Sequence, residues 1–312
     1  MKLRQPGHSL GQFAAIWLLL SLLAASAGAG RVSQQLGRNS LFDRPIVAGN
    51  MQLTSFSSSE ARENTRRYHL WTDMENVGRN FVSDAARVYS SPSRINGKSA
   101  LILGGVLAVG GIIYIYDQEI YDAFDRSRDA TLYKPIRNLG EDLERLGFMG
   151  TTNKFFVGGL AASYIVRWDK AVSLFSDILQ AHWTAGGFKN IANLTAGRAR
   201  PFEDKGPRSF KFDEGTSLPS GHALNIIQMA TVFSHHIDFW PFSVAAYTVA
   251  GAVSLERITS GNHWPSDVYF AVVGGYFVSK EILRFNDNRR LTIQPIAGSS
   301  NNSYGLRLSL GL

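Results

Sequence analysis

Two histidines, several basic residues and a carboxylate lie in three short segments between residues 189 and 267. The first segment is 197–201 (GRARP), the second is 218–222 (LPSGH) and the third is 257–267 (RITSGNHWPSD). An imidazole can attack an electrophile or carry a proton near neutral pH, and a planar guanidinium matches phosphate oxygens. These residue types therefore predict phosphoryl transfer.

The second segment has the pattern of a helix start. Pro219 suits the first turn of a helix, with Ser217 near the cap. The backbone N–H groups of Ser220, Gly221 and His222 would then point outward, and unpaired N–H groups at a helix start bind anions. We expect an anion site here, with a titratable ring beside it.

The third segment predicts an activated histidine. Pro265 suits a first helical position, which places His263 just before the helix and Asp267 in its first turn. A carboxylate there can accept the ring N–H of His263 and make the other ring nitrogen more nucleophilic. Arg200 and Arg257 offer guanidinium groups for phosphate oxygens.

In order and spacing, the segments resemble the signature of the type 2 phosphatidic acid phosphatase and vanadium haloperoxidase superfamily. That signature is K-x6-R-P, then P-S-G-H, then S-R-x5-H-x3-D. The second block is complete at 219–222. The third keeps Arg257, His263 and Asp267, with Glu256 in place of the serine.

The first block departs from the family pattern. Arg200 is followed by Pro201 as expected, but Asn193 stands at the lysine position and offers only a neutral amide. Lys189 lies one helical turn earlier, on the same helix face. We expect Lys189 to supply the missing charge to the phosphate site.

The resemblance implies a mainly α-helical bundle whose site lies between helices. It assigns His263 as the nucleophile that forms a phosphohistidine, Asp267 as the residue that orients it, and His222 as the general acid. It further implies that the phosphatase members need no metal or other cofactor. The residues it implies for phosphate binding are Arg200, Ser220, Gly221 and Arg257, to which we add Lys189 and Asn193.

The predicted function is a metal-independent phosphatase that hydrolyses phosphomonoesters or diphosphates of lipids, such as phosphatidate or polyprenyl diphosphate. One alternative is a nonspecific acid phosphatase that acts on soluble phosphate esters. Two others are a vanadate-dependent haloperoxidase, which Asn193 disfavours, and an envelope protein without activity, which the retained histidines disfavour.

Composition narrows the classes of protein. The 312 residues contain no cysteine, which excludes disulfides and thiolate nucleophiles. The net charge of +7 suits an anionic lipid or phosphate partner. Since no Lys/Arg-rich run with interleaved aromatics occurs, we expect no nucleic-acid partner.

The N-terminus has the features of an export signal. Lys2 and Arg4 precede an apolar stretch, 13–25, and small residues follow it in an A-x-A pattern. We expect a signal peptide over 1–29, with a retained N-terminal anchor helix as the alternative, and a polar lead-in over 30–67. We expect the protein to be exported to the cell envelope, membrane-associated and facing the periplasm.

The remaining chain predicts a helical domain over 68–288 and a tail over 289–312. The uncharged run 100–116 is near the lower length for a membrane span, and its glycines suit close helix packing; the alternative is a fully buried helix in a soluble bundle. Two other apolar runs, 155–166 and 268–279, are short for a span. Alternating residues at 304–310 predict a short C-terminal β-hairpin.

Overall fold

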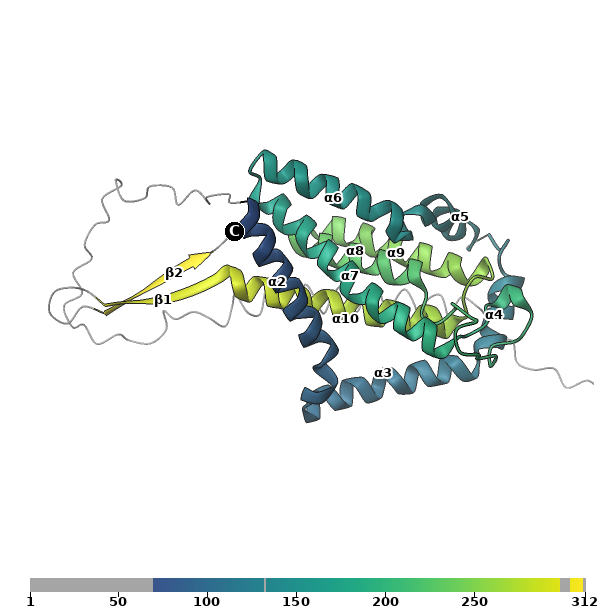
Figure 1. Cartoon of the computed structure of the whole chain (residues 1–312). Helices are drawn as coiled ribbons and strands as arrows, with labels where there is room; N and C mark the ends of the chain where they lie inside the picture. Colours follow the sequence, from purple (N-terminus) through teal and green to yellow (C-terminus); the bar gives the residue numbers. More distant parts are fainter. Residues whose placement is uncertain (1–69, 132, 298–303, 311–312) are drawn as a thin grey trace, which may run out of the picture.

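The computed structural model describes residues 70–131, 133–297 and 304–310, and these are mainly α-helical (Figure 1). The predicted signal peptide and polar lead-in lie outside the described residues. The helices are α2 (Leu70–Tyr89), α3 (Gly97–Ile115), α4 (Asp117–Arg126), α5 (Lys134–Leu143), α6 (Met149–Ile165), α7 (Asp169–Ala196), α8 (Gly221–His236), α9 (Trp240–Thr259) and α10 (Pro265–Arg290), with short 3₁₀ helices η1 (Ser91–Arg94), η2 (Glu144–Gly147) and η3 (Pro201–Glu203).

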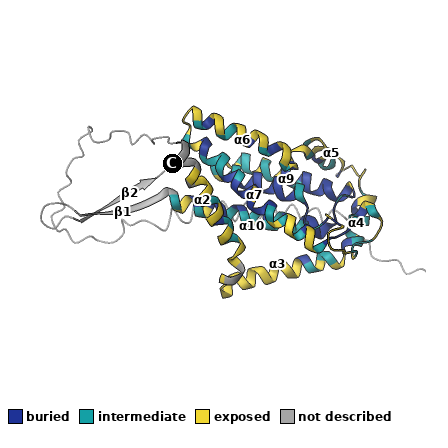
Figure 2. Cartoon of the chain, in the orientation of Figure 1, coloured by how far each residue is buried: buried dark blue, intermediate teal, exposed yellow. Residues whose placement is uncertain are grey.

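Helix α8 lies at the centre of the bundle. Every residue from 223 to 232 is buried, and α7, α9 and α10 pack around it (Figure 2). Ile178, Val253 and Leu283 join its apolar side chains in one continuous core. Burial on all sides fixes the start of α8 relative to the ends of its neighbours.

Proline lies in the first turn of α5, α9 and α10, and the sequence predicts the helix start at Pro265. Helix α9 begins at Trp240 with Pro241 in its first turn, and α10 begins at Pro265. The fixed φ of proline and its missing N–H suit this position, where an N–H has no partner within the helix.

Helix α8 begins later than expected. Its first residue is Gly221, and the N-cap is Ser220, whose Oγ accepts from the Ala223 N–H at 3.5 Å. The prediction of a start at Pro219 with Ser217 near the cap is therefore wrong. Ser217 is fully buried and bonds to groups that belong to the third segment, as described below.

Helix α3 is the one helix, among the described residues, that is long and apolar enough to cross a membrane. It packs mainly against α10, where an added Cβ at Gly110 would collide with the Phe270 ring. The other three glycines of the run 100–116, Gly104, Gly105 and Gly111, have no such neighbour among the described residues. Close packing through glycine is thus confirmed at one position of four.

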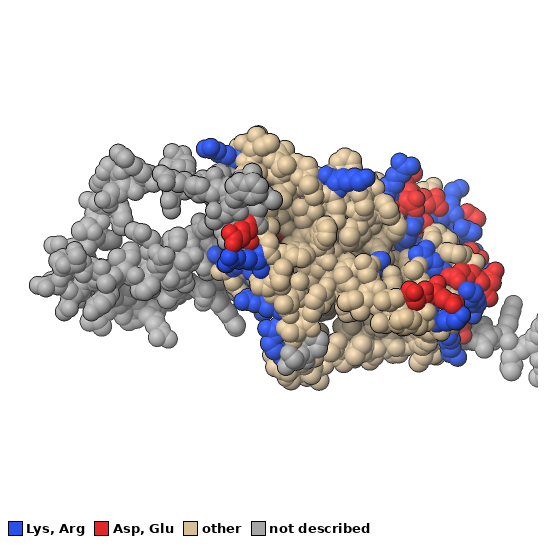
Figure 3. All heavy atoms as spheres, viewed as in Figure 1, with Lys and Arg blue, Asp and Glu red and all other residues tan. Residues whose placement is uncertain are grey.

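On the face shown in Figure 3, the middle of the molecule carries few Lys, Arg, Asp or Glu side chains, and we call this region the apolar band. Lys, Arg, Asp and Glu gather at the end near α4 and α5 and at the opposite end near α2. Between them, large apolar side chains are exposed on several helices, among them Leu107 and Ile112 on α3, Phe155 and Ile165 on α6, and Trp183 and Ile191 on α7.

The tail contains two strands, β1 (Leu291–Ala297) and β2 (Tyr304–Leu310), which pair antiparallel with Leu291 opposite Leu310. They lie away from the helix ends that carry the site (Figure 1).

Candidate active site

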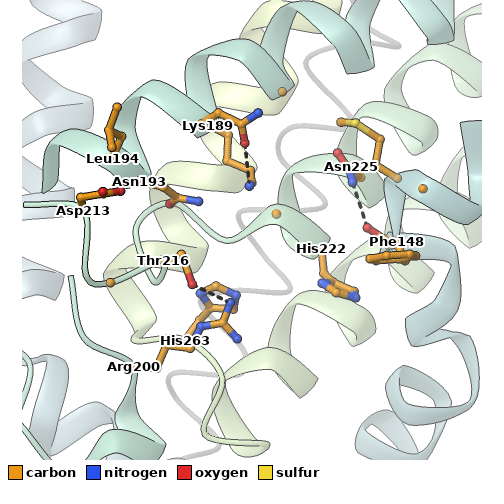
Figure 4. Close-up of a pocket in the computed structure, with 17 residues that line it drawn as sticks. Phe148, Lys189, Asn193, Leu194, Arg200, Asp213, Thr216, His222, Asn225 and His263 are labelled. Atoms are coloured by element: carbon orange, nitrogen blue, oxygen red, sulfur yellow. Dashed lines mark hydrogen bonds between the residues drawn. The ribbon is translucent and has the colours of Figure 1, made fainter. Parts of the chain in front are cut away.

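One cavity of about 560 Å³ lies where several helix ends meet (Figure 4). The end of α7, the starts of α6 and α8, and the loop before α10 all contribute to its wall. Six of the nine predicted site residues line it: Lys189, Asn193, Arg200, Gly221, His222 and His263. Both histidines therefore face one cavity, as the predicted chemistry requires.

His263 is held in one tautomer by a backbone carbonyl. Its ring is 3% exposed, and its Nδ1 lies 2.7 Å from the carbonyl oxygen of Ser217. Because a carbonyl oxygen only accepts hydrogen bonds, Nδ1 carries the proton and Nε2 keeps its lone pair. Burial, with the nearby Arg200, lowers the pKa of His263 well below its usual value, so the ring is neutral at neutral pH.

Asp267 does not bond to the His263 ring as predicted. One of its oxygens accepts from the Ser217 hydroxyl and from the Trp264 N–H, at 2.9 Å for the latter. Its other oxygen accepts from Arg198 at 2.6 Å. The carboxylate thus holds Ser217, whose carbonyl holds His263, so Asp267 orients the ring through one intervening residue.

Arg198 accounts for this difference. Its guanidinium is buried between Asp117 and Asp267, with both contacts at 2.6 Å, and it also donates to Ser266 at 2.8 Å. A buried cation requires paired carboxylates, which draws Asp267 away from the imidazole. No motif predicts a partner for Arg198, and Asp117 lies in a segment without a motif, 81 residues earlier in the chain.

His222 is the second residue of α8 and lies against the η2 wall of the cavity. A Cβ on Gly147 would approach the His222 side chain to 2.9 Å, and the ring centroid of Phe148 is 6.2 Å away. Burial and nearby cations, chiefly Arg257, lower the pKa of His222 to about 4. In the free protein the ring is therefore mainly neutral.

Arg200 and Lys189 bring positive charge to the cavity. Arg200 donates to the Thr216 hydroxyl at 3.1 Å. The ammonium of Lys189 lies 3.2 Å from the side-chain oxygen of Asn193, when the Asn193 amide is oriented to donate to the Leu218 carbonyl at 2.6 Å. The Lys189 stem also lies beside Gly221, where a Cβ would approach it to 3.2 Å. The lysine one turn before the family position thus reaches the cavity.

Three predicted residues lie outside the cavity lining. Asp267 lies outside the lining and accepts a hydrogen bond from the Ser217 hydroxyl. Ser220 is fully buried, and its N–H donates to the Asp267 carbonyl at 3.2 Å, so this N–H is not free to bind an anion. Arg257 is buried, lies outside the cavity lining and forms ion pairs with Glu144 and Glu256.

Several residues of the site carry no signal in the three motifs. Phe148 and Asn225 line the cavity, and the Asn225 amide donates to the Gly147 carbonyl at 2.9 Å. Thr216 holds Arg200. Among the described residues, no group of three or more His, Asp or Glu side chains is placed to hold a metal ion. The arrangement places a neutral imidazole, a second imidazole and two cations around one cavity.

Residues 174–291 match the family model of the PAP2 superfamily. Two proteins named lipid A 1-phosphatase are similar to this chain. The protein from Porphyromonas gingivalis is 36% identical over 114 residues, which is 32% of this chain and 22% of that protein. The protein from Rhizobium johnstonii is 28% identical over 162 residues, which is 46% of this chain and 66% of that protein.

A solved structure is also similar, that of a transmembrane PAP2 type phosphatidylglycerolphosphate phosphatase from Bacillus subtilis. It is 18% identical, with a TM-score of 0.40, and the match covers 68% of this chain and 95% of that chain.

Proposed function

We propose that this chain, a member of the PAP2 superfamily through residues 174–291, is a lipid phosphate phosphatase that works through a phosphohistidine. The observation that carries the proposal is the position of His263. A neutral imidazole with a free Nε2 shares one cavity with Arg200, Lys189 and His222. A nucleophile, a proton donor and cations around one phosphoryl group are what transfer to histidine requires.

In the first step, Nε2 of His263 attacks the phosphorus and the bond to the leaving oxygen breaks. Protonated His222 gives its proton to that oxygen, so the product leaves as an alcohol. Arg200 and Lys189 neutralise charge on the phosphoryl oxygens. The bound phosphate group favours the protonated form of His222, which the free protein disfavours.

In the second step, water attacks the phosphohistidine. Neutral His222 accepts a proton from the water, the P–N bond breaks, and inorganic phosphate leaves. Asp267 contributes indirectly, because it holds the Ser217 residue whose carbonyl fixes the His263 tautomer.

We propose a lipid as the substrate, because apolar side chains stand at the cavity. Phe148 and Leu194 both line it, and they remain 55% and 45% exposed. The relatives are named for lipid A, so a phosphorylated lipid A is the first substrate to test. We also propose that α3 lies in the bilayer and that the protein is exported with its site facing the periplasm.

The test is a panel of substrates with detergent-solubilised protein: lipid A, phosphatidate, polyprenyl diphosphate and p-nitrophenyl phosphate. We expect phosphate release from at least one lipid, and a loss on the order of a thousandfold in His263→Ala. His235→Ala is the matched control, since His235 lies on α8 outside the cavity lining.

Brief incubation with labelled substrate should leave an acid-labile, base-stable phosphoprotein in the wild type and none in His263→Ala. Activity that survives in His263→Ala would reject the nucleophile. Turnover of p-nitrophenyl phosphate with none of any lipid would favour the soluble acid phosphatase.

A further inference from the structure

Arg257 is held from one side by two carboxylates. Its Nε and Nη2 contact Glu256, and Nη2 also contacts Glu144. The side chain is 6% exposed, and its Nη1 makes no hydrogen bond among the described residues. The two carboxylates thus occupy the Nε–Nη2 edge and leave the Nη1 N–H groups for another acceptor.

Glu144 belongs to the element that forms one wall of the cavity. It begins η2, which ends at Gly147, and Gly147 packs directly against His222. The Gly147 carbonyl is held by Asn225, one turn after His222 on α8. Glu144 therefore stands at the junction of the Arg257 side chain and the His222 wall, with its own side chain 46% exposed.

The charges that face His222 come from four neighbouring elements. Arg257 on α9, Arg200 before η3 and Lys189 on α7 all disfavour the protonated ring. The neutral His263 ring lies across the same cavity. Glu144 on η2 acts in the opposite sense and raises the pKa of His222.

We propose that Glu144 is a positioning residue for the reaction, which sets the direction of the Arg257 guanidinium and offsets the cations around the proton donor His222. The inference rests on the proposed phosphatase function. Glu256 also contacts Arg257 and so helps to set the direction of its guanidinium. Glu256 is the residue at the position where the family has a serine. Glu144 has the second task because η2, the element it begins, packs through Gly147 against His222, so its negative charge acts on that ring.

Substrates with different leaving groups separate the effect of Glu144 on the Arg257 orientation from its effect on the proton donor His222. A nitrophenolate leaves without help from an acid, whereas an alkoxide requires the proton of His222. Glu144→Gln keeps the size of the side chain and removes its charge. We expect kcat for a lipid phosphate to fall at least about tenfold, and kcat for p-nitrophenyl phosphate to fall less than about threefold.

The pH profile gives a readout that a purely structural role would not move. Without the Glu144 charge the pKa of His222 falls further, so its protonated fraction is lost at lower pH. The alkaline limb of kcat for the lipid phosphate should shift to lower pH. Glu144→Asp should recover most of the rate. Glu141→Gln is the matched control, on an exposed carboxylate one turn earlier that lies outside the cavity lining.

The inference is overturned if Glu144→Gln slows both substrates equally with an unmoved pH limb, or if it behaves like Glu141→Gln. These outcomes require an active wild type. A wild type without turnover or phosphoprotein would instead reject the proposed function itself.

Discussion

The imidazole of His263 takes its orientation from a backbone carbonyl, and the backbone in turn is held by side chains. Ser217 accepts from the ring through its carbonyl and donates through its hydroxyl to Asp267. Because burial raises the pKa of Asp267 to about 6 while Arg198 opposes the rise, the carboxyl is ionised at neutral pH and can accept both hydrogen bonds. Ser217 lies between the two side chains, so Asp267 orients His263 through Ser217. The residue spacing alone predicts direct contact between Asp267 and His263.

The two histidines predict a loss of activity toward alkaline pH. His222 must be protonated to act as an acid, and its pKa in the free protein is about 4, so its active fraction falls as the pH rises. His263 must be neutral, and its pKa lies well below 6.5. We therefore expect kcat/KM, corrected for ionisation of the substrate, to decrease as the pH rises above neutrality, and protonation of Asp267, whose pKa is about 6, to lower it on the acid side.

Initial rates from acid to alkaline pH would check this, and a kcat/KM that rises toward alkaline pH would contradict it. The limb of kcat should lie at higher pH than that of kcat/KM, because bound phosphate stabilises protonated His222.

The role of Lys189 can be tested by moving the lysine to position 193, where the family has it. Lys189→Ala should lower kcat/KM about tenfold, since a charged hydrogen bond to phosphate is lost. Adding Asn193→Lys to this variant should restore much of the rate, because both side chains reach the same part of the cavity. Asn193→Lys alone is the control. Unchanged kinetics in Lys189→Ala would remove this lysine from the site.

At the scale of elements, the start of α10 is tied to α4 and to the loop that follows α7. Asp117, the first residue of α4, accepts from the Ser266 N–H at 2.8 Å and from Arg198 at 2.6 Å. Arg198 also lies over the Trp264 ring, 5.7 Å from its centroid. This buried network positions His263 because it fixes Trp264 and Ser266, which follow it at the start of α10.

Removal of one side chain from this buried network should therefore lower both the free energy of unfolding and kcat. In Asp117→Ala the Arg198 charge stays buried with one partner fewer, and removal of one partner from a buried pair costs roughly 3–5 kcal/mol. Denaturation in detergent should show a lower free energy of unfolding, with reduced kcat. Asp129→Ala is the control, since the Asp129 side chain is 78% exposed. Equal stability of the two variants would contradict the structural role of the network.

At the scale of the whole molecule, the apolar band and the two charged ends suit a protein that lies in a bilayer. The cavity is lined by residues at the starts of α6 and α8 and just before α10. These helix starts lie toward the end of the molecule that carries α4 and α5 (Figure 1). With the proposed lipid substrate, the phosphate head group enters the cavity while the acyl chains lie beside the apolar helices. Net charge of +7 favours such anionic lipids.

A charge placed in the middle of α3 tests this arrangement. Leu107 is 55% exposed, so Leu107→Arg would not disturb a core. If α3 spans the bilayer, arginine at its centre costs about 2.5–3.5 kcal/mol, and the amount of protein in the membrane fraction should fall. Glu119→Arg on α4 is the control and should have little effect. A Leu107→Arg variant with unchanged membrane yield would argue against a lipid-facing α3.

Much of the site follows from local sequence. Pro265 starts α10 and so places His263 just ahead of it, and the position of Lys189 one turn before Asn193 follows from helical periodicity. The helical class of the domain and the chemistry of the two histidines could likewise be predicted, because they depend on residue types and short spacings.

The tertiary structure decided which polar groups pair. Asp267 bonds to Arg198 and Ser217 in place of His263, and Arg257 pairs with Glu144. A buried charge is costly without a partner, so each one pairs with a group that helix packing brings close to it. Asp117 and Glu144 come from segments with no motif, far from the histidines along the chain. Their part in the site depends on how helices pack against each other, which the spacing of residues along one chain does not specify.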